Sequence, residues 1–119
     1  MFTIVFYRDE KGREPVKEYL MKLSEKGDKE SSIRKNKFRD YIQILSVKGT
    51  YAGKPYLKHL VGNLWELRPL DDRIIFACFE KGVFVLLHVF RKTTDKTPRE
   101  EIRKAKAEYD SFIRRNSNG

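Results

Sequence analysis

The sequence predicts one α+β domain spanning residues 1–119, in which a strand and two helices precede a run of hairpin-connected strands and a last helix. Apolar residues recur at helical spacing in residues 15–48 and again after residue 98. Residues 56–92 instead alternate β-branched or aromatic stretches with turn residues. Because helices grouped before consecutive hairpins favour antiparallel pairing, we expect a mostly antiparallel sheet. A chain of 119 residues is too short for a second core.

The first half of the chain predicts a strand followed by a helical hairpin. Residues 2–7 are β-branched and aromatic, which is typical of a strand. Pro15 stands at a favoured first helical position, and helical periodicity then continues to Gly27. A second amphipathic helix is predicted for residues 29–48, and Gly49 ends it.

The second half predicts four strands and a closing helix. The strands are expected at residues 56–60, 64–68, 73–80 and 83–92, the last two joined by a tight turn at Lys81-Gly82. The final helix begins at Thr97-Pro98-Arg99-Glu100, where a capping threonine precedes a proline and a glutamate follows three residues later.

The charge and the cysteine content bound the setting of the protein. The chain carries 26 basic and 17 acidic residues, a net charge of +9 that attracts nucleic acid, ribosome surfaces, anionic membranes or acidic proteins. One cysteine, Cys78, permits no internal disulfide, and no apolar run is long enough for a signal peptide or a membrane span. These features indicate a reducing, cytoplasmic setting.

The lengths of the two later hairpin loops predict which strand residues share a face, because directly opposed residues point to the same side of a sheet. We assume a four-residue loop after residue 68 and a two-residue turn after residue 80. One face then collects Glu66, Arg68, Arg73, Ile75, His88, Phe90 and Lys92. The other face is the predicted core face and collects Trp65, Leu67, Ile74, Phe76, Val85, Leu87 and Val89.

The first of these faces brings three cations, one carboxylate and one imidazole to one end of the sheet. Such a set suits RNA cleavage in which a ribose 2′-OH attacks the neighbouring phosphodiester, because the substrate then supplies its own nucleophile. Fixed arginine and lysine groups stabilise the charge that builds on the phosphate. Glu66 or His88 can assist proton transfer, and Phe90 offers a surface for base stacking.

Simpler roles for the same residues stay open. The two arginines can sit in solvent paired with Asp71 or Asp72, which themselves look like a turn pair. His88 can be a histidine at the edge of the core that bonds a backbone group, and Phe90 can serve ordinary packing. Because the cations lie at strand ends, their replacement is expected to change folding little.

Other chemistries lack a pattern in this sequence. The two histidines and one cysteine show no metal-ligand spacing, and neither a Ser/His/Asp nor a Cys/His signature is present. The seven glycines are scattered turn residues and form no phosphate-binding loop. We therefore expect neither a metal ion nor a cofactor.

Several segments resemble HigB-like toxins of the RelE/ParE superfamily. They are Lys58-His59-Leu60, Leu64-Trp65-Glu66-Leu67-Arg68-Pro69, Arg73-Ile74-Ile75-Phe76, Leu86-Leu87-His88-Val89-Phe90-Arg91-Lys92 and Lys96-Thr97-Pro98. The resemblance is continuous over roughly residues 56–105, and the element order agrees over the whole chain. It implies the RelE-like microbial RNase fold and a ribosome-dependent endoribonuclease that cuts translated mRNA and so arrests translation and growth.

The resemblance also implies roles for individual residues. Arg73 matches the arginine that opens the fourth strand, and Lys92 matches the basic residue that closes the last strand; in the family both face the phosphate. Glu66 stands where the relative RelE has lysine, so a lysine-based proton step does not carry over. The catalytic candidates are Arg73, Lys92, Glu66, Arg68 and His88, and the RNA-binding candidates are Lys58, His59, Phe90 and Lys96.

The implied partners are the ribosome with its mRNA and a HigA-like helix-turn-helix antitoxin. The toxin–antitoxin complex is expected to be of higher order and to bind operator DNA through the antitoxin, with no membrane involved. One alternative is a ParE-like poison of DNA gyrase on the same fold. The other is a non-enzymatic module whose basic ends grip nucleic-acid phosphates.

Overall fold

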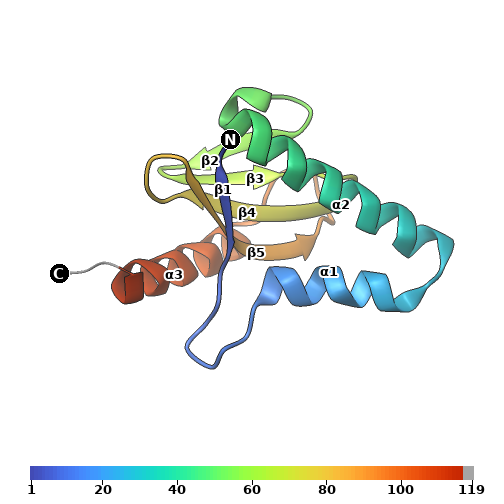
Figure 1. Ribbon diagram of the computed structural model, residues 1–119, viewed down its shortest axis with the longest axis horizontal. Coiled ribbons are helices and arrows are strands. Elements are labelled where there is room, and N and C mark those ends of the chain that lie inside the picture. The colour runs from blue at the N-terminus through green and yellow to red at the C-terminus, as the bar shows by residue number, and fades with distance from the viewer. Residues whose placement is uncertain (117–119) are drawn as a thin grey trace.

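One five-stranded sheet organises residues 1–116, the part of the chain that the computed structural model describes. In chain order the elements are β1 (Thr3–Phe6), α1 (Pro15–Lys26), α2 (Lys29–Lys48), the short 3-10 helix η1 (Gly49–Ala52), β2 (Leu57–Val61), β3 (Leu64–Leu67), β4 (Asp72–Cys78), β5 (Val83–Arg91) and α3 (Arg99–Asn116) (Figure 1). The sheet order is β1-β5-β4-β3-β2; β1 pairs with β5 in parallel and the other neighbours are antiparallel. The predicted α+β class is confirmed.

Local signals explain the helical hairpin. Pro15 begins α1, and Gly27 follows it with a φ of 71°, the left-handed conformation that commonly ends helices. The Asp28 carboxylate accepts a hydrogen bond from the backbone N–H of Ser31 at 3.0 Å and so caps α2. The predicted helices are confirmed. None of the helices within residues 1–116 combines the length and apolar character that crossing a bilayer requires.

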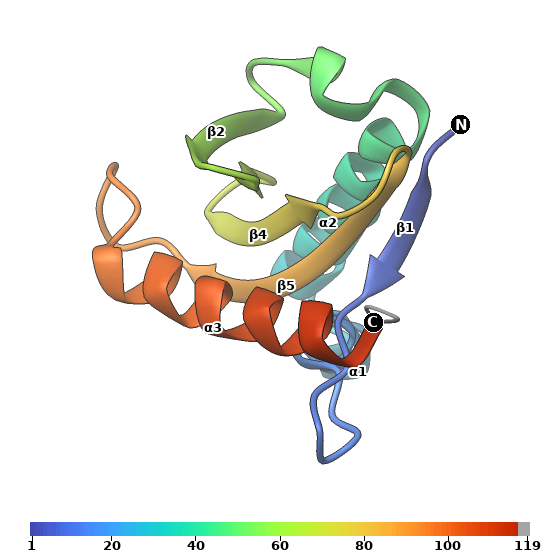
Figure 2. The same cartoon turned by 90° about the vertical axis from the view of Figure 1, so that its left-hand side faces the viewer.

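Helices cover both faces of the sheet, as Figure 2 shows for α2 and α3. On one face, α1 and α2 pack on β4 and β5 through a core that includes Val16, Phe38, Leu45, Ile74, Phe76 and Leu86. On the other face, α3 packs through Ile75, Ala77, Val85, Leu87, Ala105 and Phe112. The face that carries the charged residues at its end is therefore a second core face, because α3 packs on it.

The predicted register is confirmed at the end of the sheet that carries the charged residues. Glu66 lies opposite Ile75, and Ile75 in turn lies opposite His88. Arg73 lies opposite Phe90.

The register nearer the β4–β5 turn differs from the prediction in two places. The connection is a three-residue loop, in which the Phe79 N–H donates to the Val83 carbonyl and Gly82 adopts a φ of 80°. A β-bulge then shifts the pairing by one residue between Ile75 and Phe76. The shift from the loop and the shift from the bulge cancel each other, so the pairing agrees with the prediction from His88 onward. Before that point the pairing is displaced by one residue, and Val85 and Leu87 pack under α3 and not on the predicted core face.

Candidate functional site

Glu66 ties β3 to the start of α3. Its side chain is 1% exposed, and one carboxylate oxygen accepts a hydrogen bond from the Thr97 hydroxyl at 2.6 Å. The other oxygen lies 3.6 Å from Nε of Arg68, an atom that is buried and makes no hydrogen bond within residues 1–116. Glu66 is thus a buried carboxylate that connects β3 to the start of α3. Arg68 lies beside it, and Nε of Arg68 lacks a hydrogen-bond acceptor among the described residues.

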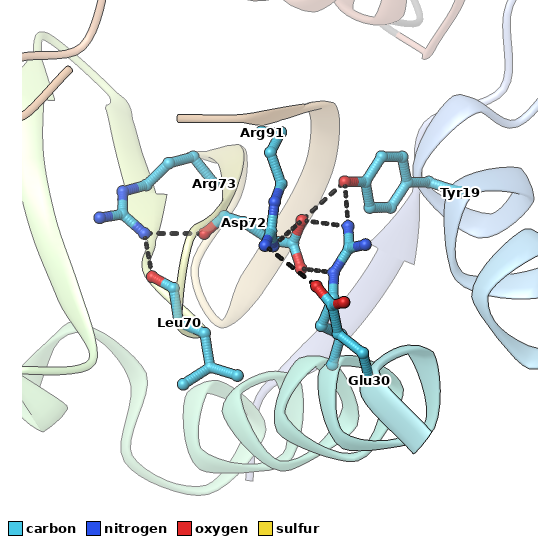
Figure 3. Close-up of polar contacts among 7 residues, drawn as sticks. Tyr19, Glu30, Leu70, Asp72, Arg73 and Arg91 are labelled. Carbon is cyan, nitrogen blue, oxygen red and sulfur yellow. Dashed lines mark hydrogen bonds and ion pairs between the residues drawn. The ribbon is translucent and has the colours of Figure 1, made fainter. Parts of the chain in front are cut away.

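Arg73 is held by the loop between β3 and β4. Its Nη1 donates to the carbonyl oxygens of Leu70 at 2.7 Å and Asp72 at 2.9 Å (Figure 3). Only 6% of the residue is exposed, so the alternative in which Arg73 sits in solvent is wrong, and its place at a strand end is no reason to expect that its loss changes folding little. The physical reason is the loop itself, which turns back so that a backbone carbonyl meets the guanidinium.

Burial and charged neighbours of both signs act on the Arg73 guanidinium. Burial and, secondly, the charge of Arg68 lower the pKa of Arg73, while Glu66, Asp71 and Asp72 act in the opposite direction. Two guanidinium groups thus influence each other in a poorly solvated place. An added anion would relieve this repulsion.

Lysines surround this pair of arginines. Lys92 follows β5, and its backbone N–H donates to the Asp71 carbonyl at 2.9 Å, which places it beside the loop that holds Arg73. Its Nζ lies 3.4 Å from exposed Asp95, a contact that contributes little in water. On the other side, Lys58 lies directly opposite Glu66 in the β2–β3 ladder.

Three of the predicted RNA-binding residues line one small cavity. Its volume is about 160 Å³, and Lys58, His59, Lys96 and Thr97 contribute to its wall. Because Thr97 also donates to Glu66, this cavity adjoins the carboxylate that lies beside Arg68. The structure therefore joins residues of β2, of β3 and of the segment before α3, which the sequence alone could not place together.

The two histidines are engaged by protein groups. Nε2 of His59 lies 2.8 Å from the Gly62 carbonyl, which satisfies this nitrogen within its own hairpin. Nε2 of His88 lies 2.7 Å from Glu101 and its Nδ1 lies 3.6 Å from Glu108, both residues of α3. His88 is thus occupied by carboxylates of α3.

Phe90 is half-buried under α3, and its ring stacks on that of His88 with 5.9 Å between centroids. The packing role considered for Phe90 therefore applies. A base can stack on it only at the edge that α3 leaves open.

A buried acid on the opposite face escaped the sequence analysis. Asp72 is fully buried and accepts hydrogen bonds from the Tyr19 hydroxyl at 2.6 Å and from Arg34 at 2.9 and 3.2 Å, while Arg91 Nη1 lies 3.4 Å away (Figure 3). Burial, then Asp72, raise the pKa of Tyr19 to about 12. The turn-pair interpretation is wrong for Asp72, the first residue of β4.

Alternation was the signal that could have found this acid. Asp72 is two residues before Ile74 and four before Phe76, both of which lie in the core under α1 and α2. A carboxylate at a core position requires cationic or hydrogen-bonding partners. Arg91, opposite Asp72, is the corresponding cation on β5, and it points to the face opposite Arg73 as alternation requires.

No group of three histidine, cysteine, aspartate or glutamate side chains that could hold a metal ion occurs within residues 1–116. The polar groups assembled at the site are mainly cationic, which suits an anionic ligand.

Comparison with known proteins identifies the family. The family model described as Phage derived protein Gp49-like (DUF891) matches residues 18–110, a stretch that contains every candidate residue above. Among curated proteins, none matches the chain significantly. The match covers α2, four strands and most of α3, so it includes both faces of the sheet. The chain therefore belongs to the Gp49-like family of phage-derived proteins, a RelE/HigB-type family of toxins in toxin–antitoxin systems.

Proposed function

We propose that this toxin is a HigB-like endoribonuclease that cleaves translated mRNA on the ribosome, in the cytosol and without a metal ion or cofactor. The observation that supports this most is the buried Arg73 with Arg68 as a cationic neighbour. Two such groups in one poorly solvated place favour an anionic ligand, and perturbed ionisable groups of this kind cluster at functional sites. A phosphodiester is the anion that a chain of net charge +9 attracts most strongly on a ribosome.

In the proposed reaction the 2′ oxygen forms a bond to phosphorus while the bond from phosphorus to the 5′ oxygen breaks. The products are a 2′,3′-cyclic phosphate and a 5′-hydroxyl. Arg73 and Lys92 hold the scissile phosphate, and Arg68 adds charge beside them. Because two carbonyls already fix the Arg73 guanidinium, no reorganisation is needed as charge develops on the phosphate.

The site is less well arranged for proton transfer than for binding the phosphate. Glu66 is buried and bonded to Thr97, and His88 lies between Glu101 and Glu108. Either group takes part in the reaction only after it leaves its partner. We therefore propose that the ribosome aligns the 2′-OH with its phosphate, and that purified toxin cuts free RNA slowly.

The neighbouring candidates form the proposed path of the RNA. Lys58 and Lys96 contact backbone phosphates from either side of the 160 Å³ cavity. His59 and the open edge of Phe90 contact bases or sugars next to the scissile phosphate.

Single-turnover cleavage of mRNA on programmed ribosomes tests this function. Because Arg73 is buried, Arg73→Lys is preferable to alanine: it keeps a charge but loses the planar fork. We expect Lys92→Ala and Arg73→Lys to reduce the rate by about 10²-fold, the usual cost of one preorganised charge donor. The matched control is Lys81→Ala, an exposed lysine in the β4–β5 loop, which should cleave at the wild-type rate.

Four results would contradict the proposal. Near wild-type rates for both site variants, or an equal loss in Lys81→Ala, would place the reaction elsewhere. Cleavage that chelator abolishes and added Mg²⁺ restores, on ribosomes shown to be intact, would refute metal independence. Growth arrest with DNA breaks and no new mRNA ends would instead indicate a gyrase poison.

A further inference from the structure

A second cavity lies on the face of the sheet opposite the proposed RNA site. Its volume is about 620 Å³, and it lies between the first turns of α2, the β3–β4 loop and the end of β5. Its lining includes Lys29, Glu30, Ile33, Leu70, Asp71 and Arg91. The proposed cleavage does not use this cavity.

Two apolar side chains stand exposed at the cavity. Ile33 is 47% exposed and Leu70 is 46% exposed, although both are large aliphatic residues. Leu70 also has a φ of 56°, a left-handed conformation that costs a residue with a Cβ about 1–2 kcal/mol. A glycine would make the same turn without this cost. Covering this exposed apolar pair would favour association with a partner, because burial of apolar surface drives most protein–protein binding.

Of the three cations that line the cavity, Arg34 is firmly bound and the other two are loosely engaged. Arg34 satisfies buried Asp72 with two hydrogen bonds. Arg91 is 40% exposed and makes only longer contacts, at 3.4 Å to Asp72 and 3.8 Å to Glu30 (Figure 3). Lys29 forms no ion pair within residues 1–116. The cavity thus presents two available cations next to two exposed apolar side chains.

We infer that this cavity binds a segment of the antitoxin in which a bulky apolar side chain lies within one helical turn of an aspartate or glutamate. The apolar side chain packs between Ile33 and Leu70, and the carboxylate pairs with Arg91 and Lys29. RNA fits less well, because the apolar pair of Ile33 and Leu70 offers no aromatic ring for base stacking. The inference depends on membership of a toxin–antitoxin family and goes beyond the proposed cleavage.

The same loop connects this cavity to the proposed site. The Leu70 side chain lines the cavity, while the Leu70 carbonyl accepts the hydrogen bond from Arg73. An occupant that moves Leu70 therefore also moves an acceptor of Arg73. An antitoxin bound here acts on the cation that faces the phosphate without covering the RNA path.

Calorimetric titration of purified toxin with the protein encoded by the neighbouring gene tests the inference. Ile33→Ala and Leu70→Gly remove the apolar side chains, and glycine suits the backbone at position 70. We expect each to weaken binding at least tenfold, which corresponds to about 1.4 kcal/mol. The control is Val47→Ala, which removes a 51% exposed aliphatic side chain at the far end of α2 and should change binding less than twofold.

A salt series separates the charged part of the interaction. Lys29→Ala should weaken binding several-fold at low ionic strength and little at high ionic strength, because exposed charges are screened. Equal affinity of wild type, Ile33→Ala and Leu70→Gly would overturn the inference, as would a failure of the wild-type toxin to bind the neighbouring gene product. If a short RNA competes with the neighbouring gene product for the toxin, and Ile33→Ala also weakens the binding of that RNA, the inference would be overturned in favour of RNA. None of these outcomes decides the cleavage proposal, which the ribosome assay measures separately.

Discussion

On the sheet face that α1 and α2 cover, stability should depend most on the buried acid Asp72. Asp72→Asn keeps the shape and the oxygen that Tyr19 bonds, but it removes the charge and turns an amide donor toward Nε of Arg34. In the wild type, the guanidinium groups of Arg34 and Arg91 share the Asp72 carboxylate. In the variant they would face each other with no negative charge between them. The substitution thus isolates the charge from the packing.

The size of the effect follows from the contacts. Removing one partner of a buried ion pair costs about 3–5 kcal/mol, because the remaining charge stays buried. Arg34 is mostly buried but Arg91 is 40% exposed, so water reaches one of the two cations. We therefore expect a loss near the lower end, about 3 kcal/mol, from a total stability on the order of 5–15 kcal/mol.

Urea unfolding followed by circular dichroism measures this loss. The matched control is Asp71→Asn, which makes the same chemical change one residue earlier at an exposed side chain and should stay within about 0.5 kcal/mol. Asp72→Asn combined with Arg34→Gln should recover part of the loss, because both partners are then neutral. A loss below about 1 kcal/mol for Asp72→Asn, or equal losses at positions 71 and 72, would refute the reasoning.

Three further substitutions test other contacts by urea unfolding. Burial raises the pKa of Glu108 to about 7 from 4.5, so this carboxyl destabilises the fold progressively as the pH rises from about 4.5 to 7. Glu108→Gln should therefore exceed the wild type at pH 8 by about 1 kcal/mol, allowing for partial exposure, and match it near pH 4; a gain confined to low pH would contradict this sign. Gly49→Ala should cost about 2 kcal/mol, because its Cβ would lie 2.7 Å from the Phe2 ring at a φ of 59°, whereas Gly62→Ala meets no atom within 4 Å and should cost less; the reverse order would be inconsistent with the packing. Thr97→Val should cost about 1–3 kcal/mol by leaving the Glu66 carboxylate without its hydroxyl donor, and an unchanged midpoint would show that water replaces it.

Much of the fold could be predicted because its signals are local. Pro15 and Gly27 bound α1 by backbone geometry alone, and the loop after residue 68 set the pairing of Glu66 with Ile75. The position of Arg91 on the face opposite Arg73 followed from the two-residue repeat of a strand. These features need no knowledge of which helix covers which face.

The rest depends on contacts between distant segments. Asp72 meets Tyr19 and Arg34 only because α1 and α2 cover the same face of the sheet. His88 was a catalytic candidate from sequence, but the docking of α3 sets two carboxylates against its ring. No periodicity in either segment predicts such a contact between side chains.

The three-residue loop at Gly82 and the bulge in β5 have a consequence for insertions and deletions. Each shifts the strand by one residue, and together they leave Phe90 and Lys92 on the side of Arg73. A deletion of one residue in the loop leaves Phe79 opposite Val83 across a two-residue turn, so Arg73 stays opposite Phe90. A deletion in β5 after the bulge has no extra residue to absorb it, so it would move Lys92 to the place of Arg91, on the face of α1 and α2.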